Sequence, residues 1–280
     1  MSSADGSTSD WSPPAGADEL ADGKLLLDRP AEQVARLTIV NPAKRNALDH
    51  PILDALAQTA RELDARCLLL TGAHGMFSAG YDIGGMPDET FAEEAESLVA
   101  HPFADAIEAL DTYRYPVVAA LPGHAIGGGL EVALAADLRV AAGGIRVGMP
   151  PAKLGLVYSH TGIQKFLDTI GAARTRELFL VGRNIPVQTA LEWGLVNEVV
   201  EPAVVQERAL ELAEEIAANA PLSLSGNRRI IRELLAARSR LDPRVERELV
   251  ELRRRCFASE DFREGVRAFG EKRPARWRGL

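Results

Sequence analysis

The chain of 280 residues has few cysteines and no long apolar run. Its two cysteines, Cys67 and Cys256, lie far apart and form no CxxC pair, which disfavours a disulfide framework or a zinc site. A reducing cytoplasm is the expected compartment. No apolar run approaches the length that crosses a bilayer. The first 23 residues have neither a basic flank nor an apolar stretch, so we expect no signal peptide and no membrane anchor.

Motifs of several well-known enzyme classes are also missing. The sequence has no GxGxxG in a dinucleotide-binding context and no GxxxxGK[ST], which disfavours the usual ways of holding nucleotide phosphates. It has no GxSxG elbow and no Cys/His constellation, so a serine or cysteine hydrolase would lack its nucleophile. No repeat with the period of a solenoid or a propeller is present.

The net charge of −8 is unevenly distributed along the chain. Residues 1–23 contain five acidic and no basic side chains, which leaves −3 for the rest. This segment has too little apolar surface to fold, so residues 1–22 are predicted to form a disordered acidic tail. Residues 253–280 carry nine basic and four acidic side chains, a local charge of +5. Such a surface suits a small polyanion better than a nucleic acid, and a solvated helix face explains it equally well.

Strands and helices alternate in the first part of the chain. Apolar patterns predict strands over 24–28, 34–41, 67–71, 116–121, 138–141 and 145–148, and helices over 51–64 and 92–110. This order indicates an α/β core with ligand-binding loops at the ends of its strands.

From residue 162 onward the patterns are mainly helical. Helices are predicted over 164–170, 172–180, 187–193, 204–219, 222–237, 243–256 and 262–269, with one strand over 196–200. We therefore expect a core domain over 23–200 and a helical C-terminal region over 201–280.

Two glycine-rich loops follow the predicted strands 67–71 and 116–121. The first spans 75–84, and the second, 123–131, contains three consecutive glycines that lead directly into a predicted helix. Unpaired N–H groups at such a helix start favour a phosphate or a developing oxyanion, although a tight strand-to-helix turn explains the glycines about equally well. Glu131 is a candidate catalytic carboxylate one turn inside this helix, where it would otherwise serve the helix dipole.

Four segments, in order and spacing, resemble the crotonase, or enoyl-CoA hydratase/isomerase, superfamily. They are NPAKRNALD at 41–49, FSAGYD at 77–82, GHAIGGGLE at 123–131 and LVGRNIPVQTALEWGLVNEVV at 180–200. The resemblance implies an α/β (α+β) spiral of repeated ββα units that form two roughly perpendicular sheets. It also implies an acyl-CoA substrate and a helical C-terminal region that builds a homotrimer or a dimer of trimers. We expect no cofactor besides the coenzyme A of the substrate, no metal, and no nucleic-acid or membrane partner.

The same resemblance implies roles for individual residues. The backbone N–H groups of Tyr81 and Gly128 would form an oxyanion hole, each stabilising a developing enolate by roughly 3 to 4 kcal/mol. Glu131 matches the first of the two glutamates that family hydratases use. Contacts with coenzyme A are implied for Lys44, Arg45, Ala79, Asp82, Ile83, Phe269 and Lys272. For any single basic residue of this set, a solvated surface charge is the plainer explanation.

One position departs from the hydratase pattern. The second carboxylate, on which family isomerases also rely, is replaced by Pro151, which cannot transfer a proton. The segments MPPAKLGLVY at 149–158 and ASEDFREGVRAFGEKR at 258–273 instead resemble methylmalonyl-CoA decarboxylases. Those enzymes lack the second glutamate and carry a tyrosine that matches Tyr158, but they have a histidine where this chain has Tyr81. His124 and His160 are candidates to compensate, although each is more simply a hydrogen-bonded loop residue.

We therefore predict decarboxylation of a malonyl- or methylmalonyl-CoA-type substrate through an enolate held in the oxyanion hole. Two alternatives stay open: an enoyl-CoA hydratase or isomerase that works with one glutamate, and an inactive crotonase-fold scaffold or RNA-binding protein. The glycine loops, Glu131 and Tyr158 occur together, and the net charge outside the tail is only −3. Both observations argue against the scaffold and the RNA-binding protein.

Overall fold

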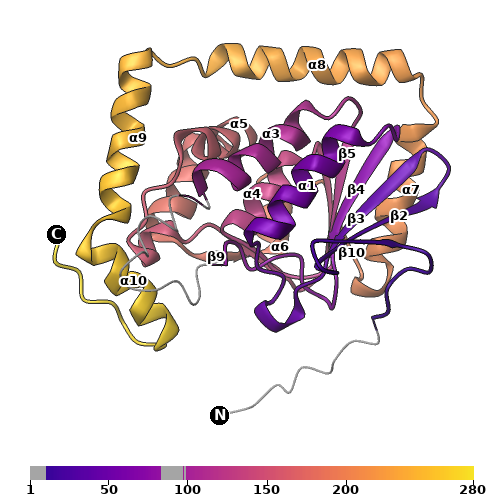
Figure 1. Cartoon of the computed structure of the whole chain (residues 1–280). Coiled ribbons are helices and arrows are strands. Elements are labelled where there is room, and N and C mark those ends of the chain that lie inside the picture. Colours follow the sequence, from indigo (N-terminus) through magenta and orange to yellow (C-terminus); the bar gives the residue numbers. More distant parts are fainter. Residues whose placement is uncertain (1–10, 83–96, 98) are drawn as a thin grey trace.

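The computed structural model describes residues 11–82, 97 and 99–280, and a seven-stranded sheet lies at its centre (Figure 1). The strand order is β1-β2-β3-β4-β5-β7-β10. The strands are β1 Asp18–Leu20, β2 Leu25–Ala31, β3 Val34–Ile39, β4 Cys67–Gly72, β5 Val117–Leu121, β7 Leu138–Ala142 and β10 Glu198–Val200. The first three strands are antiparallel neighbours, whereas β3, β4, β5, β7 and β10 run parallel.

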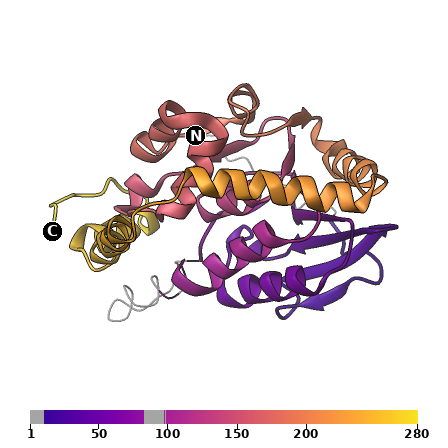
Figure 2. The same ribbon diagram turned by 90° about the horizontal axis from the view of Figure 1, so that it is seen from above.

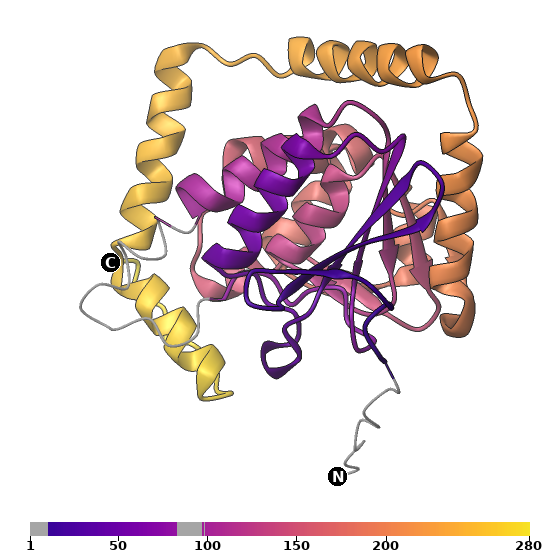
Figure 3. The ribbon, with the colours of Figure 1, turned by 45° about the vertical axis from the view of Figure 1, so that its right-hand side comes forward.

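The central parallel strands are covered on both faces, which explains their continuous apolar sequences. Every residue of β4 and β5 is buried. Helix α7 (Val205–Ala217) packs on one face of the sheet, and α1 (His50–Glu62) and α3 (Ala104–Thr112) lie on the other side (Figures 1 and 3). The α/β core predicted from the sequence is thus confirmed.

A second, three-stranded sheet supports the glycine triplet. Its strands, in the order β6-β8-β9, are β6 Ala125–Ile126, β8 Arg146–Gly148 and β9 Asn184–Pro186. The amide of Gly127 donates to the carbonyl of Gly148 at 2.9 Å and extends the pairing of β6 with β8 by one residue. Helix α4 (Gly128–Ala135) therefore starts directly from this sheet.

The C-terminal region is helical, as predicted. The other helices are α5 His160–Arg176, α6 Val187–Glu192, α8 Pro221–Arg238, α9 Pro243–Phe257 and α10 Glu260–Gly270, with short 3₁₀ or π turns at Pro42–Lys44, Val99–Phe103, Pro151–Leu154, Glu177–Val181 and Pro202–Val204. Helix α5 bends at Gly171, whose φ of 73° is not helical. This bend explains why the sequence predicts two helices that meet at that glycine.

Helix α8 crosses over the core and α9 runs back along its side (Figures 2 and 3). Arg228 holds α8 to the core, because its Nε lies 2.7 Å from Asp137 and its guanidinium donates to the carbonyl of Leu110 at 2.8 Å. No residue of α8 is buried, and four of its large apolar side chains are exposed, namely Leu222, Ile230, Ile231 and Leu234. Leu224 packs partly buried against the core. The exposed apolar face of α8 has no partner within the described part of the chain.

The predicted disordered tail over 1–22 is wrong at its C-terminal end. Residues Asp18–Leu20 form β1, which pairs with β2 from Asp18 opposite Leu27 to Leu20 opposite Leu25. Leu20 packs partly buried against the core and supplies the apolar contact that composition alone did not reveal. Among the residues that the structure describes, no helix is long and apolar enough to cross a membrane.

Candidate active site

A buried asparagine joins the segment 41–49 to the first glycine loop. The side-chain amide of Asn46 donates to the carbonyls of Ala73 at 2.9 Å and Met76 at 2.8 Å. Its carbonyl oxygen accepts the amide of Asn41 at 2.8 Å. With all these groups paired in the interior, the two loops form one fixed unit.

This unit leaves the amide of Tyr81 without a partner. Leu48 donates its amide to the carbonyl of Gly80, and Asp82 donates its amide to the carbonyl of Leu48, both at 2.8 Å. Successive N–H groups of an extended segment point to opposite sides. The amide of Tyr81 therefore faces away from Leu48, and it donates no hydrogen bond to any described residue.

The second unpaired amide belongs to Gly128, the first residue of α4. The N–H of a first helical residue has no partner inside the helix, and no other described residue accepts it. Gly80 adopts a φ of 97°, and a Cβ built on it would lie 3.2 Å from the Gly128 nitrogen. A Cβ on Gly128 would lie 2.9 Å from the Tyr81 ring. The structure thus brings the two predicted oxyanion donors side by side and leaves no room there for a larger residue.

A chain of hydroxyl and carboxyl groups lies beside these amides. Glu131, in the first turn of α4, is only 3% exposed. The hydroxyl of Tyr158 donates to the Glu131 carboxylate, and the hydroxyls of Tyr158 and Tyr81 are 3.2 Å apart. Edge-to-face contacts hold both rings, Tyr81 on Phe103 at 4.6 Å and Tyr158 on Phe179 at 5.5 Å between ring centres.

Burial changes the acidity of all three groups. It raises the pKa of Glu131 from 4.5 to about 7, although the hydrogen bond from Tyr158 and the charge of Lys165 oppose the shift. It also raises the pKa of Tyr81 and of Tyr158 well above 10. Near neutral pH the tyrosines are therefore neutral donors, and Glu131 exchanges a proton readily.

Glu131 is the one buried carboxylate among the residues that the structure describes. Pro151, at the place of the second hydratase glutamate, is buried at the start of the turn Pro151–Leu154. No group of three side chains suited to a metal occurs in the described part of the chain. Among the described residues, the site therefore combines two unpaired amides with one carboxyl group.

The family model for enoyl-CoA hydratase/isomerase matches residues 29–279. The chain belongs to this family. It is 32% identical to the carnitinyl-CoA dehydratase of Proteus mirabilis, over 91% of this chain and 94% of that protein. It is 30% identical to the 2,3-dehydroadipyl-CoA hydratase of Escherichia coli, over 91% and 99%. A solved structure of methylmalonyl-CoA decarboxylase in complex with 2-nitronate-propionyl-CoA is similar with a TM-score of 0.83 and 27% identity, over 92% of this chain and 99% of the other.

The chain is thus a crotonase-family enzyme that acts on an acyl-CoA. The fold, and the family to which the sequence motifs point, are confirmed. The comparisons offer both hydratase and decarboxylase chemistry.

The residues predicted to contact coenzyme A fall into two groups. In the first group, the Lys44 ammonium lies 2.6 Å from the Asp82 carboxylate, and the amide of Ala79 donates to the carbonyl of Arg45 at 3.0 Å. Two contacts thus join Lys44 and Arg45 to the loop that carries Tyr81. Phe269, 65% exposed, and Lys272 lie at the end of α10. No hydrogen bond or ion pair between described residues joins them to the first group. Ile83 lies outside the described residues.

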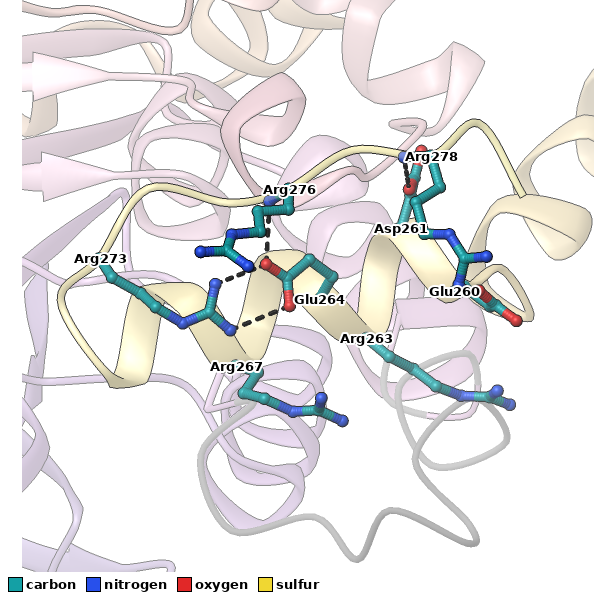
Figure 4. Close-up of a pocket in the computed structure, with 8 residues that line it drawn as sticks. All are labelled: Glu260, Asp261, Arg263, Glu264, Arg267, Arg273, Arg276 and Arg278. Atoms are coloured by element: carbon teal, nitrogen blue, oxygen red, sulfur yellow. Dashed lines mark hydrogen bonds and ion pairs between the residues drawn. The ribbon is translucent and has the colours of Figure 1, made fainter.

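A groove of about 630 Å³ lies along α10 (Figure 4). Its lining consists of the charged side chains of Glu260, Asp261, Arg263, Glu264, Arg267, Arg273, Arg276 and Arg278. The Arg273 guanidinium donates two hydrogen bonds, of 2.5 and 2.9 Å, to the Glu264 carboxylate. These bonds lower the pKa of Glu264 to about 2. Arg263 and Arg267 form no ion pair with described residues and remain available to an anion.

In the described part of the chain, the side chains of the two candidate histidines, His124 and His160, form no hydrogen bond with Tyr81, Glu131 or Tyr158. His124 accepts the amide of Arg146 at 2.9 Å, and His160 lies 3.6 Å from Glu246 of α9. His124 is therefore a hydrogen-bonded loop residue, and His160 is a residue at a helix start that pairs with Glu246. These are the simpler of the roles considered from the sequence. Sequence reasoning missed Gly162, where a Cβ would lie 2.7 Å from Glu131, because a lone glycine in a helix has no distinct pattern.

Proposed function

We propose that this enzyme decarboxylates a malonyl- or methylmalonyl-CoA-type thioester by way of an enolate. The observation that carries the proposal is one buried carboxyl group, Glu131, beside two amides without partners, each of these counts being made over the described residues. This carboxyl group accepts a hydrogen bond from Tyr158. Decarboxylation needs stabilisation of an enolate and one proton. It needs no base to create the carbanion, so Pro151 is no obstacle.

The bond between C2 and the substrate carboxylate breaks first. Its electron pair moves into the thioester and forms an enolate, while the carboxylate leaves as CO₂. The amides of Tyr81 and Gly128 donate to the enolate oxygen as a pair of fixed donors. Two such donors stabilise the negative charge that develops on the thioester oxygen as CO₂ departs. They therefore stabilise the transition state more than the bound substrate and raise the rate of decarboxylation.

The enolate then takes a proton at C2 and becomes the product thioester. Glu131, with a pKa of about 7, supplies that proton from its neutral form and regains one from solvent. Tyr158 hydrogen-bonds Glu131, and its hydroxyl also reaches that of Tyr81. We assign it the role of orienting the substrate carboxylate before cleavage.

The remaining parts of the proposal concern coenzyme A and assembly. Lys44 and Arg45 adjoin the Tyr81 loop, and we assign them, with Ala79, Asp82, Phe269 and Lys272, to the coenzyme A chain and its phosphates. The exposed apolar residues of α8 support assembly as a homotrimer or a dimer of trimers. We also propose a cytoplasmic enzyme without a further cofactor.

Hydration or isomerisation by Glu131 alone is the second candidate. It is supported by the identity of 32% with a carnitinyl-CoA dehydratase and of 30% with a 2,3-dehydroadipyl-CoA hydratase. With Glu131 as the one buried carboxylate among the described residues, such a reaction should be about a hundredfold to ten-thousandfold slower than with two carboxylates.

Parallel incubation with malonyl-, methylmalonyl- and crotonyl-CoA, followed by mass spectrometry, separates the candidates. We expect loss of CO₂ from one of the first two substrates and little addition of water to the third. Fast hydration of crotonyl-CoA that Tyr158→Phe leaves unchanged would contradict the proposal.

A further inference from the structure

Arg253 lies on the face of α9 that packs against the active-site loop. One turn further along α9, Cys256 donates its thiol to the carbonyl of Gly155 at 2.8 Å and accepts the amide of Val157 at 3.2 Å. Glu246, two turns earlier on this helix, approaches His160. Arg253 lies between these contacts on the same helix face, opposite the segment that carries Tyr158.

The guanidinium of Arg253 has no hydrogen-bond or ion-pair partner among the residues that the structure describes. Its Nε is buried and has no hydrogen bond, and the side chain forms no ion pair with any described residue. The buried Arg139 differs from Arg253 in this respect. It donates to the carbonyls of Leu195 at 2.7 Å and Ala136 at 2.6 Å. A buried guanidinium donor without a partner lowers the free energy of unfolding, because its lost hydration is not replaced by a hydrogen bond. A bound anionic ligand would supply the missing acceptor.

The charge of Arg253 reaches the reacting groups. It lowers the pKa of Tyr81 and the pKa of Glu131, in each case against the larger effect of burial. This electrostatic effect agrees with the position of Arg253 on the face of α9 that packs against the segment carrying Tyr158. An anion bound by Arg253 would lie beside the groups that act on the acyl chain.

We propose that Arg253 binds the carboxylate of the acyl group and makes the enzyme selective for acyl-CoA substrates with an anionic acyl chain. The inference rests on the proposed function in placing the acyl group at the Glu131 site. Arginine suits this role because its planar fork matches a carboxylate.

Arg253 then acts in selection and not in bond cleavage. A carboxylate loses its charge as it becomes CO₂, so its ion pair with Arg253 is strongest before the reaction. An interaction of that kind lowers KM and leaves kcat unchanged or slightly reduced. Arg253→Gln should therefore raise KM for a carboxylated substrate by about 10- to 100-fold, the range of a charged hydrogen bond, without lowering kcat.

Binding of two inert thioethers tests the inference without any turnover. One probe is 2-carboxypropyl-CoA, which has no thioester carbonyl for the two amides, and the other is its neutral carboxamide. Calorimetry on the intact wild type should show about 10- to 100-fold tighter binding of the acid. Arg253→Gln should abolish that preference and leave the affinity for the carboxamide nearly unchanged, which also shows that the variant is folded. Arg253→Lys should retain part of the preference.

Arg247→Gln is the matched control, because Arg247 is an exposed arginine of the same helix. It should leave the preference intact. Equal weakening of both probes by Arg253→Gln would show a contact with the phosphates of coenzyme A and overturn the inference. An unchanged preference would overturn it as well. A preference that depends on Arg253 in an enzyme that decarboxylates nothing would uphold the inference and refute the proposed reaction.

Discussion

Replacing Glu131 with glutamine should remove a loss of unfolding free energy that the wild type undergoes as the pH rises. Burial raises the pKa of this carboxyl from 4.5 in the unfolded chain to about 7 in the folded protein. Because the folded pKa is the higher one, the folded state is favoured while Glu131 is protonated. This contribution is fully present below about pH 4.5 and is lost as the pH rises through about 7. Glutamine stays neutral at every pH and avoids the loss.

The magnitude follows from the two pKa values, because each unit of pKa difference corresponds to about 1.4 kcal/mol. Between about pH 5 and about pH 9, Glu131→Gln should gain about 2 to 3 kcal/mol in unfolding free energy relative to the wild type. Urea denaturation at fixed protein concentration measures this difference. Glu108→Gln, on the exposed face of α3, is the matched control and should show no comparable gain. A constant difference between Glu131→Gln and wild type across this range would refute the buried, proton-exchanging carboxyl.

Four further predictions concern the site and the assembly. Gly128→Ala and Gly128→Pro both add a Cβ beside Tyr81, but only proline removes the N–H, so its kcat should be about a hundredfold lower than that of the alanine variant in a steady-state assay; equal values would exclude the amide from catalysis. Tyr158→Phe should lower kcat for the decarboxylated substrate by about a hundredfold, as stopped assays with mass detection would show, and an unchanged kcat would contradict its assigned role. Ile230→Asp on α8 should reduce the oligomer mass in light scattering, and a wild type that is already monomeric would refute the assembly proposal. Removal of residues 1–16, which deletes the ring contact of Trp11 with His74, should lower thermal stability less than removal through residue 21, which also deletes β1; equal effects would contradict a stabilising role for that strand.

Much of the fold could be predicted because its elements bury apolar residues in regular patterns. The continuous apolar runs of β4 and β5 reflect burial on both faces, and Gly171 marks the bend of α5. The strands that sequence reasoning missed lack such a signal. β6 has two residues and β9 three, and β1 is the acidic segment Asp18–Leu20. Pairing with a neighbouring strand, not local composition, fixes these elements.

The site was predictable only in part. The glycine loops and Glu131 have a local pattern that indicates stabilisation of an anion, and the resemblance adds Tyr81 and Tyr158. The contacts among these side chains were not predictable, because Tyr81 and Tyr158 are 77 positions apart and only the fold brings their hydroxyls together. Arg253 was counted merely as one charge in a basic segment. The burial of its Nε depends on the packing of α9 against the core, which the sequence pattern does not indicate.

A crystal structure with a bound acyl-CoA thioester analogue tests the central claim most directly. The thioester oxygen should lie about 2.7 to 3.1 Å from the amide nitrogens of both Tyr81 and Gly128. Its C2 should face the Glu131–Tyr158 pair. A thioester oxygen bound elsewhere, with the two amides still unpaired, would contradict enolate stabilisation at this site.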